Sequence, residues 1–190
     1  MSVNDMDLRI VKTKSLIKNA FLELRKKKPI EKITVKELCQ NAQINKSTFY
    51  SHYNDIFDLS DTLENEVVDN ILSNVQHPEY VLLKSDIFTK EIFREFMANE
   101  PYVSVLFAES RRDILVDKLK CKVKATIIKN QPQYKNNTSL DIILSYAING
   151  GYHAFTDCQK ENSKQVIEIV AKINRSINEI YEKLVSNNEI

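Results

Sequence analysis

Residues 34–53 read TVKELCQNAQINKSTFYSHY and contain the start signals of two short helices. Thr34 followed by Glu37 is a capping-box pattern, which predicts a helix over about 35–41. Asn45 is a second N-cap residue and predicts another helix over about 46–52. Two short helices joined by about four residues are typical of a helix-turn-helix.

The apolar and polar residues of this stretch divide onto two faces. The apolar ones form an inward face: Val35, Leu38, Ala42, Ile44, Phe49 and Tyr53. The second helix turns outward short side chains that can reach base edges in the major groove: Ser47, Thr48, Ser51 and His52. Lys46, at the start of this helix, is placed to meet a phosphate. The alternative is a helical hairpin inside an α-helical core, which would not need so many polar residues around two aromatics.

The charge of the chain is unevenly distributed. Residues 8–53 contain eleven Lys or Arg and three Glu, a local charge of +8, whereas the whole chain of 190 residues carries only +1. A basic N-terminal unit attached to a mildly acidic body favours a polyanion as partner. Solvated helix faces can also carry such charge runs, so this observation supports the motif and does not replace it.

The low glycine content predicts an all-α fold. The chain has two glycines, four prolines and no tryptophan. Glycine-rich phosphate-binding loops are excluded because their turns need several glycines, and turn-rich β-sandwiches and barrels are disfavoured. Further helices are predicted over 9–27, from an N-cap at Asn54 to about 76, and over a C-terminal series: 85–98, 101–108, 111–129, 138–158 and 163–186.

The other sequence features indicate neither catalysis nor a metal site. Cys39, Cys121 and Cys158 form no CxxC pair and have no zinc-ligand spacing with histidine. The three histidines lie far apart, and no carboxylate pair or nucleophile elbow stands out. We therefore expect no enzyme activity, no metal and no cofactor. With no signal-peptide core and no long apolar run, we expect a cytoplasmic protein without a membrane segment.

Residues 9–72 resemble the DNA-binding domain of the TetR family of transcriptional regulators, in particular its Gram-positive type subgroup. The motif that carries the resemblance consists of Ile33-Thr34-Val35, Leu38, Ala42, Ile44 and Ser47-Thr48-Phe49-Tyr50-Ser51-His52-Tyr53. It implies an N-terminal three-helix helix-turn-helix domain over 1–54, a linking helix over 55–76, and a helical ligand-binding and dimerisation domain over 77–190.

The resemblance also implies roles for residues of the motif. Thr34 and Tyr50 should contact phosphates. The resemblance also places five residues on or beside base edges: Lys46, Ser47, Thr48, Ser51 and His52. Nearby lysines could supply further phosphate contacts, and the sequence does not rank them: Lys12, Lys14, Lys28, Lys32 and Lys36.

Two positions depart from the family pattern. Gln43 stands where the family usually has a turn glycine, so a positive φ there would impose some strain. Ile56 follows Asp55 where the family often has a phosphate-contacting lysine at the start of its fourth helix, and one backbone contact per subunit is therefore in doubt.

The C-terminal helices carry two seams that predict a four-helix homodimer interface. The interface residues are Ala147, Gly151 and Ala154 on one helix and Val170, Ile173, Ile177, Ile180 and Leu184 on the other. Glycine inside a helix costs about 1 kcal/mol relative to alanine, which close backbone approach would offset. The alternative is that both seams are buried in the core of one subunit.

The family body also implies an effector pocket for a small apolar or aromatic ligand. Its candidate lining residues are Phe96, Tyr102, Phe107, Tyr146, Tyr152 and Phe155. The predicted function is a homodimeric repressor that binds palindromic double-stranded DNA and is released by this effector. The alternative is a DNA-binding regulator without an effector that acts through a protein partner. A cavity of several hundred Å³ would favour the first.

Overall fold

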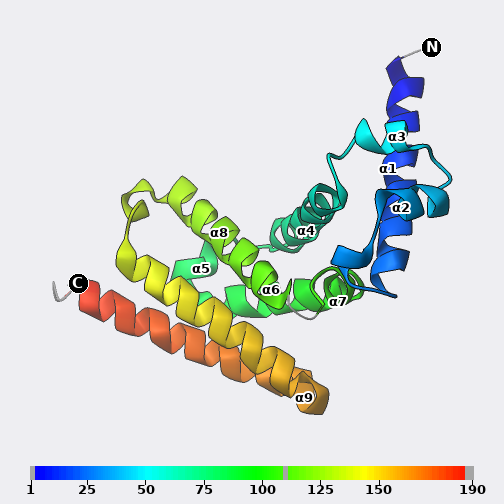
Figure 1. Cartoon of the computed structure of the whole chain (residues 1–190). Coiled ribbons are helices and arrows are strands. Elements are labelled where there is room, and N and C mark those ends of the chain that lie inside the picture. Colours follow the sequence, from blue (N-terminus) through cyan, green and yellow to red (C-terminus); the bar gives the residue numbers. More distant parts are fainter. Residues whose placement is uncertain (1–2, 109–110, 187–190) are drawn as a thin grey trace. The chain divides into compact units, whose positions relative to one another are not determined.

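The computed structural model describes residues 3–108 and 111–186, and within these ranges the chain is all-α, without a strand (Figure 1). In the same ranges, no helix combines the length and the apolar character that a bilayer span needs. The chain divides into two compact units. The N-terminal unit contains the residues up to Val67 together with Pro101–Ala108, and the C-terminal unit contains Val68–Glu100 and 111–186.

The N-terminal unit is built from short helices and one longer helix at its start. Its elements are α1 (Val3–Arg25), the 3-10 helix η1 (Ile30–Lys32), α2 (Val35–Asn41), α3 (Lys46–Tyr50), the first part of α4 (Ile56–Ser73) and α7 (Glu100–Leu106). Its core contains side chains with no exposed surface from each of these α-helices: Ile17, Phe21, Leu38, Phe49, Leu59 and Leu106. Residues 101–108, predicted as part of the C-terminal domain, group with this unit.

The helix starts in this unit follow the capping signals, with one correction. Helix α2 begins after Thr34 and α3 after Asn45, as predicted. The prediction that Asn54 caps α4 is wrong, because Asp55 Oδ1 accepts from the backbone N–H groups of Phe57 (2.7 Å) and Asp58 (2.8 Å). Helix α3 ends two residues before its predicted end, and α4 ends three before.

In the described part of the chain, the C-terminal unit combines long helices with short ones, in addition to the last part of α4. They are α5 (Tyr80–Leu83), α6 (Ser85–Ala98), α8 (Arg112–Asn130), the 3-10 helix η3 (Pro132–Tyr134) and α9 (Thr138–Ser186). Helix α9 breaks at Asn162, whose backbone is extended (φ −161°, ψ 84°), and this break separates the two predicted helices. Figure 1 shows the two arms of α9 running side by side in opposite directions.

Candidate nucleic-acid interface and ligand cavity

The turn between α2 and α3 is a Schellman motif formed without glycine. Ile44 N–H donates to the carbonyl of Cys39 (3.0 Å), and Gln43 N–H donates to that of Gln40 (3.3 Å). Gln43 adopts a left-handed conformation with φ 53°. The strain foreseen for a positive φ at this position is therefore present, and it costs on the order of 1 kcal/mol.

Thr34 and Glu37 form half of the predicted capping box. The hydroxyl oxygen of Thr34 accepts from Glu37 N–H (3.2 Å). The carboxylate of Glu37 pairs with Lys28. Because the Thr34 hydroxyl is an acceptor in this bond, its proton remains free for an outside acceptor such as a phosphate oxygen.

Asn45 organises the start of α3 through one oxygen atom. Its Oδ1 accepts from Thr48 N–H (2.8 Å), from the Ser47 hydroxyl (2.7 Å) and from the Thr48 hydroxyl (2.7 Å). The backbone donor identifies this atom as the amide oxygen, since a nitrogen could not accept from it. Both hydroxyl protons must therefore point toward Asn45.

A third hydroxyl beside this helix also directs its proton to an acceptor inside the unit. The Ser51 hydroxyl donates to the backbone carbonyl of Thr48 (2.7 Å). Ser47, Thr48 and Ser51 thus use their protons inside the N-terminal unit. Their hydroxyl oxygens can still accept hydrogen bonds from an outside donor, while the ammonium group of the nearby Lys46 can donate them.

The eight predicted DNA-contacting residues lie at the surface of the N-terminal unit. Thr34, Lys36, Lys46, Ser47, Tyr50 and Ser51 are exposed, and Thr48 and His52 are half-buried. The two aromatics that the motif assigns to the core, Phe49 and Tyr53, are buried and their ring centroids lie 5.8 Å apart. The face assigned to base reading is thus not packed away inside its own unit.

Ion pairs separate the lysines of this unit into two groups. Lys18 pairs with Glu66, Lys26 with Glu23, and Lys28 with Glu37. No ion pair is formed by Lys36 or Lys46 in the described part of the chain, so both charges face solvent. Ile56, at the position of the family lysine, is buried and can make no phosphate contact.

Burial raises the pKa of two titratable groups beneath this face, both of which are neutral at pH 7 even at their ordinary pKa values. Burial raises the pKa of the Cys39 thiol, although the Lys46 ammonium opposes the shift. Burial also raises the pKa of the Tyr53 hydroxyl, and the carboxylates of Glu66 and Asp58 add to the shift. The face therefore owes its charge to its lysines and not to ionised groups below.

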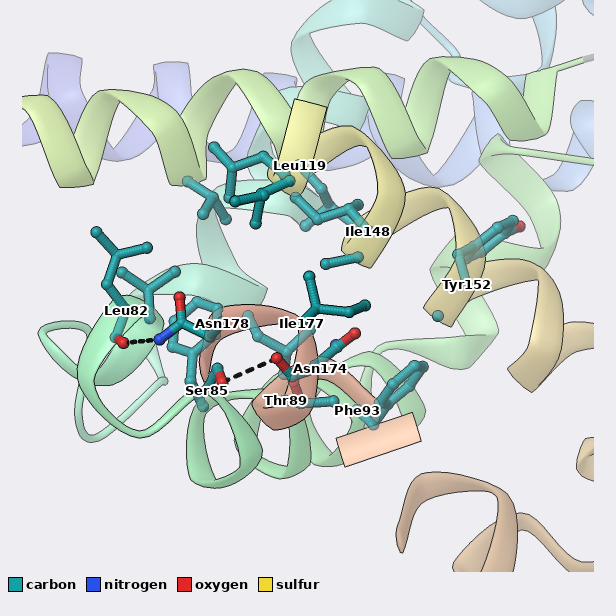
Figure 2. Close-up of a pocket in the computed structure, with 18 of the residues that line it drawn as sticks. Leu82, Ser85, Thr89, Phe93, Leu119, Ile148, Tyr152, Asn174, Ile177 and Asn178 are labelled. Carbon is teal, nitrogen blue, oxygen red and sulfur yellow. Dashed lines mark hydrogen bonds between the residues drawn. The ribbon is translucent and has the colours of Figure 1, made fainter. Parts of the chain in front are cut away.

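The C-terminal unit contains an apolar cavity of about 100 Å³. Figure 2 shows side chains of α5, α6, α8 and both arms of α9 around it. Leu119 and Ile148 line one side, and Ile177 faces them from the other. No charged side chain lines this cavity.

A polar strip interrupts the apolar wall where α9 meets α5 and α6. Asn174 Nδ2 donates to the Thr89 hydroxyl oxygen (3.0 Å), and the Ser85 hydroxyl donates to the backbone carbonyl of Asn174 (3.3 Å). The side-chain amide of Asn178 donates to the carbonyl of Leu82. All four side chains of the strip line the cavity: Ser85, Thr89, Asn174 and Asn178.

Two of the six predicted ligand residues, Phe96 and Tyr152, line this cavity. Phe155 is buried against Phe93 and Phe96 without lining it. Phe107 is buried, and Tyr102 is 43% exposed, in the N-terminal unit, where Lys18 Nζ lies 5.5 Å from the Tyr102 ring centroid. Tyr146 is 67% exposed.

The predicted dimer residues also divide between inside and outside. Gly151 and Val170 are buried, and Ala147 and Ile177 line the cavity with Gly151. Exposed on α9 are Ala154, Ile173 and Ile180. The side chain of Leu184 lies outside the described residues. Other large apolar side chains are exposed on α9: Ile142, Tyr146 and Ile169.

Two features of these sites were not predicted: the orientation of the Ser47 and Thr48 hydroxyls by Asn45, and the polar strip of the cavity. A signal for the first was present, since an N-cap asparagine followed by Ser47 and Thr48 places two hydroxyls beside its oxygen. A weaker signal for the second was the pair Asn174 and Asn178, four residues apart within an apolar seam.

No protein-family model matches this sequence, and no curated protein matches it either. In the part of the chain that the structure describes, no three His, Cys, Asp or Glu side chains gather into a group that could hold a metal ion.

Proposed function

We propose that this chain is a DNA-binding transcriptional regulator of the TetR type, which binds palindromic duplex DNA as a homodimer with α3 in the major groove. The observation that carries the proposal is the division of the 34–53 motif into a buried apolar side and an exposed polar side. Unpaired lysines beside α3 supply the positive charge that a phosphate backbone requires.

The contacts proposed for α3 follow from its hydrogen-bond inventory. Lys46 and Lys36, with the free proton of Thr34 and the Tyr50 hydroxyl, bind phosphates and set the register. Ser47, Thr48 and Ser51 present acceptors, so they favour the amino groups of adenine or cytosine in the major groove. His52 lies beside them and is half-buried.

The homodimer is supported by the outer face of α9. Five large apolar side chains on its two arms are between about half and two thirds exposed: Ile142, Tyr146, Ile169, Ile173 and Ile180. Exposed apolar side chains at helical spacing on neighbouring arms are typical of a surface that another copy covers. We expect Ile173→Glu to yield monomers in analytical ultracentrifugation, whereas Lys172→Glu, one residue away and also exposed, should leave dimers.

Two modes of regulation remain candidates. In the first, a ligand in the cavity shifts the population of conformers, and α4, which contributes residues to both units, transmits the change. In the second, no small molecule acts and a protein partner does. A cavity of about 100 Å³ is too small for a drug-sized effector, whose pockets measure about 300 Å³ or more, so the first mode requires a smaller ligand.

The experiment that tests DNA binding is retention of genomic fragments by the purified chain, followed by titration of a retained duplex. Lys46→Ala should weaken binding about tenfold or more. It should also reduce the slope of log K against log salt by about two, one for each subunit. Lys129→Ala, an exposed lysine at the end of α8, is the matched control. Equal affinities of both variants and the parent would show that α3 is not the binding face.

A further inference from the structure

The chemistry of the cavity in the C-terminal unit restricts what it can hold. Its wall carries no carboxylate, ammonium or guanidinium group. A charged ligand would lose its hydration there without gaining a counter-ion, which strongly disfavours its binding. The occupant must therefore be uncharged.

The size of the cavity sets a second limit. A cavity of about 150 Å³ lined by aliphatic and aromatic side chains accommodates benzene. The cavity here measures about 100 Å³. It has room for about four to six non-hydrogen atoms without movement of its walls.

Asn178 supplies the third restriction. Its Nδ2 must face the Leu82 carbonyl, because a carbonyl oxygen can only accept, and this fixes the orientation of the amide. The Asn178 oxygen then lies on the other side, as Figure 2 shows. In the described part of the chain, no protein donor reaches this oxygen or the side-chain oxygen of Asn174, and both residues line the cavity. A ligand with an O–H or N–H group would satisfy them.

We propose that this cavity binds a small neutral molecule with an aliphatic body and one hydrogen-bond donor, of the class of short-chain alcohols, held at its polar end by the Asn174–Asn178 strip. The apolar body lies against Leu119, Ile148 and Ile177. Binding of this molecule does not depend on the proposed function, whereas its role as the effector does.

The test uses four probes of similar size on the full chain, with binding followed by protein NMR. The probes are 1-pentanol, its isomer ethyl propyl ether, butanoate and pentylammonium. We expect saturable shifts of the Asn178 side-chain amide with 1-pentanol. The ether, which accepts but cannot donate, should bind about three- to tenfold more weakly. The two ions should not bind. Binding of an ion as tight as that of the alcohol, or no saturable shift with 1-pentanol, would overturn the proposal.

The second experiment fills the cavity with a larger side chain. Ala147→Leu places a larger side chain in the lining and should abolish the 1-pentanol shifts, whereas Ala125→Leu, exposed on α8, should leave them unchanged. Unchanged binding in a folded Ala147→Leu chain would also overturn the proposal. If Ala147→Leu fails to fold, the four probes on the parent decide alone.

The role as effector has its own readout. Addition of 1-pentanol should change the affinity of the parent chain for a retained duplex, and should not change that of Ala147→Leu. If the chain retains no DNA but binds 1-pentanol, the proposed function fails and the cavity assignment stands. If the chain retains DNA but shows no saturable shift with 1-pentanol, the cavity assignment alone fails.

Discussion

In the N-terminal unit, side chains close the first turns of α2, α3 and α4, whereas α5, α6 and α8 of the C-terminal unit begin without any side-chain cap. Thr34, Asn45 and Asp55 accept the free N–H groups of the former three helices. The residues before the latter three, Glu79, Lys84 and Arg111, make no such bond. Within the C-terminal unit, α9 has such caps at Asn137 and Asn162, whereas α5, α6 and α8 depend on apolar faces that meet across long sequence distances.

This difference matches what each unit is proposed to do. Local caps allow the five residues of α3 to keep a defined shape while their polar side faces solvent. Packing of long helices against one another leaves a void where their side chains do not fill the space, and the cavity of the C-terminal unit lies among such helices.

The largest effect is expected where packing dominates. Leu140 is completely buried in a cluster with Leu82, Val123, Ile127 and Leu144. Leu140→Ala should lower the free energy of unfolding by about 2–5 kcal/mol in urea denaturation, because it removes buried methyl groups and leaves a hole. Leu83→Ala, at a leucine that is 67% exposed in the same unit, should change it by less than about 0.5 kcal/mol. Similar losses in both variants would contradict the role assigned to packing.

The second effect concerns the caps. Asn45→Ala removes the acceptor of three hydrogen bonds and should cost about 1–2 kcal/mol of stability. Asn45→Asp retains an oxygen acceptor, so its stability should stay within about 0.5 kcal/mol of the parent, while its added negative charge weakens DNA binding.

Asn162→Ala is the counterpart in the C-terminal unit, where the side-chain oxygen accepts from Gln165 N–H (3.1 Å). It should cost about 1 kcal/mol or less, because fewer groups lose their partner. Thermal unfolding of the three variants measures the difference. A larger loss at Asn162 than at Asn45 would reverse the comparison of the two units.

The same contrast explains how much the sequence could predict. Capping signals act within four residues, so α2 and α3 began where predicted. At α4 two neighbouring cap residues competed, and the outcome depended on Asp58 accepting from both nitrogen donors of Asn54. The four-residue helix α5 has no cap, and the sequence analysis missed it.

The C-terminal site was less accessible to sequence reasoning. The polar strip needs Ser85 beside Asn174, 89 residues later in the chain, and helical periodicity does not show which faces meet. Helical spacing therefore identified candidate apolar positions without separating those that face the cavity, such as Ile177, from those that face solvent, such as Ile173.

The third prediction tests the strained turn of the N-terminal unit. Gln43→Gly should raise the free energy of unfolding by roughly 1 kcal/mol, because glycine adopts a φ of 53° without a steric penalty. Gln40→Gly, in the exposed part of α2, should lower it by about 1 kcal/mol and is the matched control. In the C-terminal unit, Asn136→Gly (φ 63°) should raise the free energy of unfolding less than Gln43→Gly does, because asparagine tolerates this conformation better than glutamine. No gain at Gln43 would show that the turn stores no strain.

The smallest effect separates the two adjacent glycines of α9. At Gly150 an added Cβ meets nothing within 4 Å, so Gly150→Ala should stabilise the unit by about 0.5–1 kcal/mol through helix propensity. At Gly151 the added Cβ would lie 3.2 Å from Val170 Cγ1 and 3.9 Å from Phe93 Cζ. Gly151→Ala should therefore raise the free energy of unfolding less than Gly150→Ala, or lower it, since the Val170 side chain must give by a few tenths of an ångström.

A double-mutant cycle with Val170 tests whether crowding at Gly151 causes this difference in stability. If crowding causes the difference, Val170→Ala should offset part of the cost of Gly151→Ala, so the double variant is more stable than the sum of the single changes predicts. Gly150→Ala combined with Val170→Ala should be additive, because the Gly150 position has open space around it. Additivity in both pairs would mean that close approach of the two arms is not what places glycine at 151.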